Sequence, residues 1–192
     1  RPRPTSSSLN YRTNSQRFGQ TIGALSAGRS LCVFTSATAN VSLIVHGYFV
    51  DGTALRFTPV TPTRLVNTKQ TGRQSLIEVP VPAGADTVAL NVTVAGASNG
   101  GGVHVFPCYD PSVYQAPFSF AANETAGTHV IVETSDASTI CVQVAADALL
   151  TDVFVDLTGT FSPGGALEYN VAAPKRLLDT RLRVGGWTGR HG

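Results

Sequence analysis

An 18-residue stretch that occurs twice limits how this chain can fold more than any other feature. Residues 52–69 read GTALRFTPVTPTRLVNTK, residues 164–181 read GGALEYNVAAPKRLLDTR, and the two align without a gap. A match of this length, separated by roughly one domain, is the mark of a tandem array. The positions that define this repeat junction are Pro62, Arg64, Asn67 and Thr68 in the first copy and Pro174, Arg176, Asp179, Thr180 and Arg181 in the second.

The repetition extends beyond this stretch. Residues 8–32 align with 117–141, and residues 41–49 align with 153–161 after a three-residue insertion in the second copy. We therefore expect repeats of about 110 residues. The predicted units are the C-terminal half of a first repeat over 1–51, a complete repeat over 52–163, and the linker and opening strand of a third repeat over 164–192.

Short runs of β-forming residues separated by turn residues fill the sequence. In DTVALNVTVA (86–95), Val and Leu alternate with Ala, Asn and Thr, which predicts a strand with one buried face. Three glycines follow, and VHVF (103–106) resumes the pattern, so the pair predicts a hairpin. Further strands are predicted over 129–134, 138–144 and 152–157. These signals predict an all-β fold of tandem antiparallel β-sandwich repeats, Ig-like or jelly-roll-like.

Three cysteines test this layout. The complete repeat contains Cys108 and Cys141, and we predict a disulfide between them. The counterpart of Cys108 in the preceding repeat would fall before Arg1, so Cys32 is the odd cysteine, expected to lie outside the disulfide or to bridge between chains. A disulfide indicates an oxidising, extracellular compartment. The alternative is three buried thiols in a cytosolic protein.

Several short motifs recur in a recognisable order: PKRLLDTR (174–181), ALNVTV (89–94), FPC (106–108), CVFTS (32–36) and GYF (47–49). Together they resemble the tandem repeats of secreted, cell-envelope-associated proteins of actinobacteria. The resemblance covers nearly the whole chain, and its motifs are structural. It implies secretion, a β-rich fold, one disulfide in each repeat, and a surface or scaffolding role, alone or beside hydrolase domains.

The two copies of the repeated stretch differ where chemistry would be sought. Asn67 and Lys69 stand where the second copy has Asp179 and Arg181. Since both copies do not require the same charges, we do not predict a catalytic or metal site here. We expect the triplet to lock a corner of the fold, with arginine donating to carbonyls and Asp or Asn accepting from turn amides.

Composition excludes several classes of function. The 14 basic and 12 acidic residues are scattered and leave a net charge of +2, which argues against nucleic acid and anionic membranes as partners. No apolar run approaches the length of a transmembrane helix. The four histidines lack zinc-site spacing, and neither a GxSxG elbow nor a phosphate loop occurs. We therefore predict no enzyme, no cofactor and no metal.

Two candidate sites each have a simpler interpretation. Asp152 and Asp156 would face the same side of a strand, a spacing that suits calcium, although two solvated charges explain it as well. A cluster of aromatic residues is a candidate for stacking on a cell-wall polysaccharide, with core packing as the alternative for its phenylalanines. Its members are Tyr109, Tyr114, Phe118 and Phe120.

The sequence favours a structural role outside the cell. We predict an extracellular structural or adhesive repeat protein that forms a stalk, surface layer or filament, with sandwiches joined by short linkers that contain Pro59, Pro62, Pro163 and Pro174. The half-repeats at the two ends predict self-association by strand exchange, with a longer polypeptide as the alternative. The competing prediction is a carbohydrate- or cell-wall-binding module attached to an envelope hydrolase.

Overall fold

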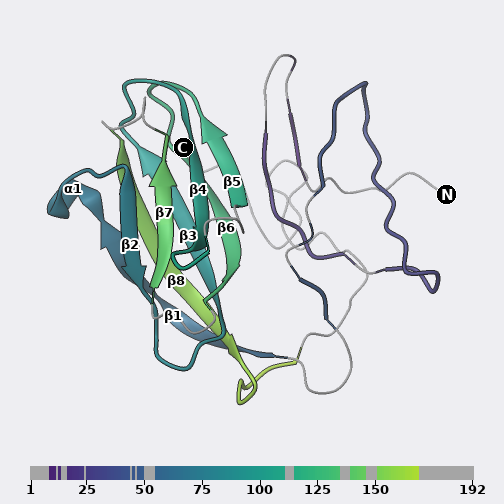
Figure 1. Ribbon diagram of the computed structural model, residues 1–192. Coiled ribbons are helices and arrows are strands. Elements are labelled where there is room, and N and C mark those ends of the chain that lie inside the picture. Colours follow the sequence, from purple (N-terminus) through teal and green to yellow (C-terminus); the bar gives the residue numbers. More distant parts are fainter. Residues whose placement is uncertain are drawn as a thin grey trace, which may run out of the picture.

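The computed structural model describes residues 9–11, 13, 17–23, 25–43, 45, 47–49, 55–110, 115–134, 139–145 and 151–168. Its regular structure lies between Arg56 and Ser162 (Figure 1). The elements are β1 (Arg56–Asn67), α1 (Thr68–Thr71), β2 (Leu76–Pro80), β3 (Thr87–Ala95), β4 (Gly101–Pro107), β5 (Gln115–Phe120), β6 (Ala126–Glu133), β7 (Thr139–Val144) and β8 (Asp152–Ser162).

The eight strands form two antiparallel four-stranded sheets that pack face to face. One sheet has the order β1-β8-β3-β6, and the other has the order β2-β7-β4-β5. This arrangement confirms the predicted all-β class and the β-sandwich architecture. Within the described residues there is one such sandwich, of about 110 residues, so the tandem arrangement stays a prediction.

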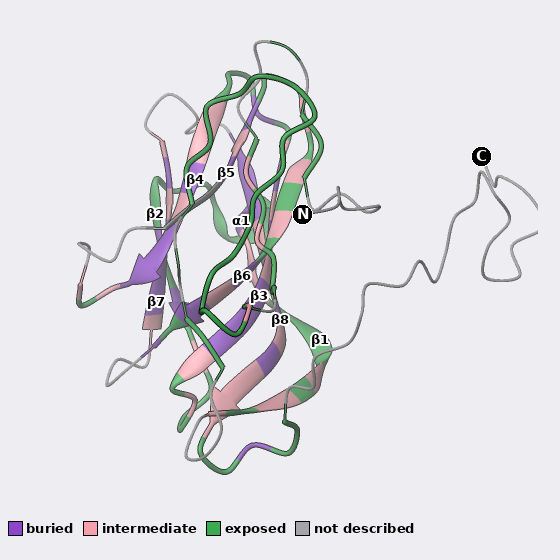
Figure 2. Ribbon diagram, turned by 90° about the vertical axis from the view of Figure 1, so that its right-hand side faces the viewer, coloured by how far each residue is buried: buried purple, intermediate pink, exposed green. Residues whose placement is uncertain are grey.

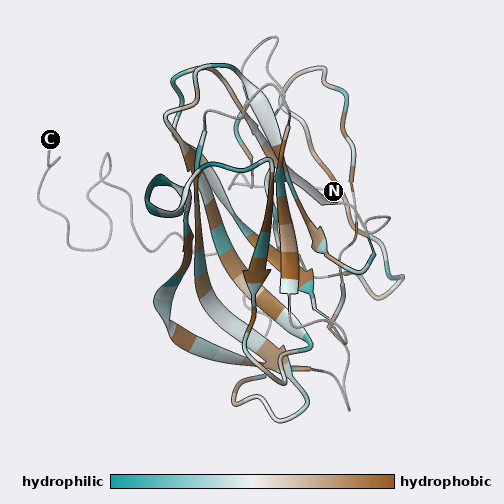
Figure 3. Cartoon of the chain, turned by 60° about the vertical axis from the view of Figure 1, so that its left-hand side comes forward, coloured by the Kyte–Doolittle hydropathy of each residue, from teal (hydrophilic) through white to brown (hydrophobic). Residues whose placement is uncertain are grey.

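Alternation of residue types produces the sandwich core. Along β3, Val88, Leu90, Val92 and Val94 are fully buried, whereas Asn91 and Thr93 between them are partly exposed and Ala89 is covered. Bands of apolar and polar residues therefore alternate along the strands in Figure 3, and buried bands alternate with less buried ones in Figure 2. Burial of these side chains from both sheets is the main stabilising contribution to such a fold.

The predicted hairpin between residues 86–95 and 103–106 is wrong. β3 pairs with β6 and β8, whereas β4 pairs with β5 and β7 in the opposite sheet. The connecting loop therefore crosses from one sheet to the other. Gly96 turns the chain with a φ of 66°, and the amide of Asn123 donates to the carbonyl of Ala97 at 2.8 Å. A hairpin and an arch between sheets share the same alternating pattern, so the pattern alone does not separate them.

The first copy of the repeated stretch forms β1, an edge strand that pairs along its length with β8. Pro59 and Pro62 therefore lie inside a strand, and their predicted placement in a linker is wrong. Proline has no N–H to give to a ladder, which restricts it to edge strands and irregular positions. The pairing with β8 indeed changes register between Pro59 and Thr63.

The chain folds back onto β1 after it leaves β8. Leu167 lies opposite Phe57, and the two residues exchange backbone hydrogen bonds of 2.9 and 2.8 Å. The amide of Ala166 donates to the Thr58 hydroxyl at 3.2 Å, and Arg56 forms a 2.7 Å ion pair with Glu168. The start of the second motif copy is thus held against the first.

Candidate functional site

A row of polar side chains crosses the outer face of the β1-β8-β3-β6 sheet. The strand register places Arg64 opposite Asp156, Asp156 opposite Asn91, and Asn91 opposite His129. These four residues, one from each strand, are called the sheet-face row below. Since neighbouring strands lie about 4.8 Å apart, the row is about 14 Å long.

Hydrogen bonds to neighbours hold the sheet-face row in place. The Nε–H of Arg64 donates to the carboxylate of Asp156, and its Nη2 lies 3.2 Å from the second carboxylate oxygen. The same guanidinium lies 4.9 Å from the centre of the Phe154 ring, within the range of a cation–π interaction. The Nδ2 of Asn91 donates to the Thr93 hydroxyl at 3.3 Å.

The tautomer of the neutral His129 ring follows from its contact with Thr158. The Thr158 hydroxyl donates to the carbonyl of Ala89 at 3.0 Å, so its oxygen accepts from His129 Nε2 at 3.3 Å. That assignment puts the proton of the neutral ring on Nε2 and makes Nδ1 an acceptor. Partial burial lowers the pKa of His129 below its ordinary value. The ring is therefore neutral at pH 7, and with Arg64 and Asp156 paired the row has no net charge.

Aromatic side chains lie beside this row on the same sheet face. The rings of Phe57 and Phe161 are 4.9 Å apart at 47°. Gly159 lies opposite Ala89, and a β-carbon on Gly159 would overlap the ring of Phe57. The outer face therefore carries an aromatic pair on a floor of small residues, next to a neutral row of donors and acceptors.

The corner predicted for the repeated stretch is held by a threonine. Thr68 is buried, and its hydroxyl oxygen accepts from the amide of Val153 at 2.7 Å, at the start of β8. Arg64 donates to a carboxylate and not to the expected carbonyls, and among the described residues the side-chain oxygen of Asn67 accepts from none of the turn amides expected to donate to it, so both expected roles are wrong. The second-copy positions Pro174, Arg176, Asp179, Thr180 and Arg181 lie outside the described residues.

The predicted disulfide is confirmed. Cys108 and Cys141 are bonded, with their Cα atoms 4.9 Å apart. Cys141 belongs to β7, and Cys108 lies in the turn after β4, so the bond joins adjacent strands of one sheet. Cys32 is exposed.

The two carboxylates considered for calcium are each bound by an arginine. Asp152 is buried and accepts from the Nε–H of Arg73 at 2.7 Å, which raises the pKa of Arg73. Asp156 pairs with Arg64. Within the described ranges, no group of three or more His, Cys, Asp or Glu side chains is placed to hold a metal ion. This arrangement favours structural ion pairs at both positions.

The predicted aromatic cluster is divided in the fold. Phe118 and Phe120 are buried in the core, as the alternative interpretation expected. Tyr109 is exposed, and Tyr114 lies outside the described residues. Within the described residues, the exposed Tyr109 is therefore not joined on the surface by the two phenylalanines, and the stacking role of Tyr109 and Tyr114 stays a prediction.

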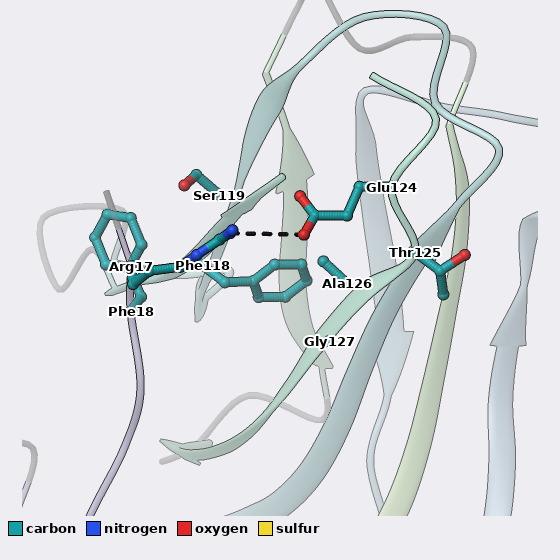
Figure 4. Close-up of a pocket in the computed structure, with 8 residues that line it drawn as sticks. All are labelled: Arg17, Phe18, Phe118, Ser119, Glu124, Thr125, Ala126 and Gly127. Atoms are coloured by element: carbon teal, nitrogen blue, oxygen red, sulfur yellow. Dashed lines mark ion pairs between the residues drawn. The ribbon is translucent and has the colours of Figure 1, made fainter. Parts of the chain in front are cut away.

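A shallow pocket of about 290 Å³ lies where the N-terminal segment meets the sandwich (Figure 4). Arg17 forms a 3.6 Å ion pair with Glu124 across it, and Phe18 packs on the sandwich core. The amide of Ile131 donates to the side chain of Gln20 at 3.1 Å. The pocket is thus a packing contact between two parts of the chain.

Comparison with known proteins adds no assignment, because no protein-family model and no curated protein matches the sequence. In the part of the chain that the structure describes, no helix is long and apolar enough to cross a membrane.

The sheet-face row is the feature that sequence reasoning missed. Each member appears in the sequence only as an outward residue of its own strand. Their convergence depends on which strands are neighbours and in what register, and a shift by one residue would turn a side chain to the other face. A partial signal existed in the outward Asn91, Asp156 and His129 of three predicted strands.

Proposed function

We propose that this chain is an extracellular structural and adhesive protein built from β-sandwich repeats. The observation that carries the proposal is the pairing of Leu167 with Phe57. These residues belong to the second and first copies of the repeated stretch, so one copy begins on the edge of the other. A repeat that starts by docking on its predecessor is suited to an ordered array.

The Cys108–Cys141 disulfide supports a location outside the cytosol. It joins β7 to the turn that follows β4 and would help a small domain to persist in an environment without chaperones. The array would form a surface layer, stalk or filament.

The contact of residues 166–168 with β1 also supplies a route to self-association. An edge strand offers unpaired backbone groups to any extended segment. The same backbone pairing that Leu167 makes with Phe57 of its own chain can be made with Phe57 of a second copy. Exchange of this segment between neighbouring copies would link them into a polymer.

Sedimentation velocity over a concentration series, with electron microscopy of the same samples, tests the polymer. We expect concentration-dependent association of the purified chain. Leu167→Pro removes the amide that donates to the Phe57 carbonyl and should abolish association, whereas Leu167→Ala keeps the amide and should preserve it. A monomer at every concentration would overturn the self-association.

The location is tested separately. Fractionation of the producing cells, followed by electrophoresis without reductant, should find the chain outside the cytosol with its disulfide intact. Recovery of a reduced chain from the cytosol would overturn the extracellular assignment.

A further inference from the structure

We propose that the outer face of the β1-β8-β3-β6 sheet binds a neutral oligosaccharide. The aromatic pair Phe57 and Phe161 supplies an apolar platform, and the sheet-face row supplies the hydrogen bonds. This inference rests on the adhesive role proposed above and gives it a ligand class.

The first argument is the shape of the surface. Outward side chains of four adjacent strands form this face, and two small, buried residues lie at its centre. Ala89 lies opposite Gly159 between the aromatic pair and the row. Phe57, Asn91 and Asp156 are half-buried and His129 is exposed, so a flat ligand can reach all of them.

The second argument is hydrogen-bonding capacity. The carboxamide of Asn91 uses one N–H on Thr93, so its oxygen and its other N–H can serve a ligand. The carboxylate of Asp156 has more lone pairs than the Arg64 fork occupies. His129 adds the acceptor Nδ1. A sugar hydroxyl is both donor and acceptor, and it matches such a mixed row.

The third argument is charge. Arg64 and Asp156 neutralise each other, and partial desolvation by its neighbours lowers the pKa of the accessible His129, which favours the neutral ring at pH 7. A sulfated or phosphorylated polymer requires a concentration of unpaired cations, which this row does not supply. The chemistry therefore selects an uncharged polyhydroxylated ligand.

The fourth argument is the aromatic platform. One side of the Phe57 ring packs against Gly159, where any β-carbon would overlap it. Phe57 is nevertheless only partly buried, and it lies beside the polar row on the same sheet face. Burial of the apolar face of a sugar ring against this surface, with its hydroxyls directed to the row, combines both properties of the site.

A glycan array probed with the purified chain tests the proposal, using immobilised neutral, sulfated and sialylated oligosaccharides. We expect binding to neutral oligosaccharides. Asn91→Ala and Asp156→Asn should each weaken it by roughly five- to tenfold, the effect of losing a net hydrogen bond. Glu78→Ala is the matched control, because Glu78 is exposed on β2 of the opposite sheet and should leave binding unchanged.

Thermal melting of each variant shows whether it is folded, and His129→Gln is a second row variant if Asp156→Asn is unstable. No binding to any neutral oligosaccharide, preference for sulfated ligands, or neutral binding that the row variants leave unchanged would each overturn the proposal. The extracellular structural role is tested by fractionation and sedimentation, so failure on the array alone would leave that role standing.

Discussion

The ring of Phe57 packs against Gly159, across the antiparallel pair formed by β1 and β8. The aromatic residue belongs to the repeated stretch and has Tyr169 as its counterpart, while Gly159 has Gly47 as its counterpart. The repeated aromatic position and the repeated glycine position, which lie far apart in the sequence, therefore form one contact. An aromatic ring laid over a strand glycine restores the packing surface that glycine lacks.

Gly159→Ala should destabilise the sandwich. Its β-carbon would overlap the Phe57 ring, and overpacking of this kind costs about 1–3 kcal/mol. The measurement is the free energy of unfolding in urea. Gly164→Ala is the control, because a β-carbon at Gly164 meets open space and should change stability little. Equal stability of the two variants would contradict the packing contact.

Thr68→Val should be destabilising by about 1–3 kcal/mol, because it leaves the buried amide of Val153 without its acceptor. The change nearly preserves side-chain volume, so the loss of stability measures the contribution of the hydroxyl group. Thr68→Ser retains that oxygen and should recover most of the stability, as measured by urea unfolding. If serine were as damaging as valine, the hydrogen bond would not be the cause.

Loss of the Cys108–Cys141 bond should lower the free energy of unfolding by about 3–4 kcal/mol, since it closes a loop with a sequence separation of 33. The comparison is between the wild-type chain and a Cys108→Ala/Cys141→Ala variant. Cys32→Ser, at an exposed position, should leave the unfolding midpoint unchanged. A double variant as stable as the wild type would contradict this expectation.

Stability should fall as the pH drops below about 6.5. Partial burial lowers the pKa of His104 and of His129, so the unfolded chain binds protons at a higher pH than the folded chain does. In that window the unfolded state holds more protons, and acidification favours it. Urea midpoints between about pH 7.5 and 5.5 measure the effect. In the His104→Gln/His129→Gln variant, the urea midpoint should depend less on pH. An unchanged slope would exclude these histidines as the cause of the pH dependence.

The strand content was predictable where outward and inward residues differ in polarity. Alternate apolar residues indicate both β3 and β8. They are Val88, Leu90, Val92 and Val94 in β3, and Val153, Val155 and Leu157 in β8. The disulfide was predictable because the repeat placed Cys108 and Cys141 in one unit. These inferences need only local periodicity and the internal alignment.

The pairing of strands was not predictable in the same way. β1 contains Pro59 and Pro62, which oppose a strand assignment unless the strand is known to be at an edge. The loop after β3 contains a glycine run typical of a hairpin, yet it connects two sheets. The sheet-face row depends on both outcomes, and therefore it appears only when the register of all four strands is known.

The pairing of Phe57 with Leu167 has a mechanical consequence. Tension applied through the flanking chain would act at one end of the β1–β8 pair and would peel its hydrogen bonds apart one after another, at low force. The unfolded chain would then be shorter than a fully extended one, because the disulfide prevents the residues between Cys108 and Cys141 from extending. The sequence separation of 33 corresponds to roughly 110 Å of extended chain. The oxidation state of this cysteine pair would thus set how far the sandwich extends under load.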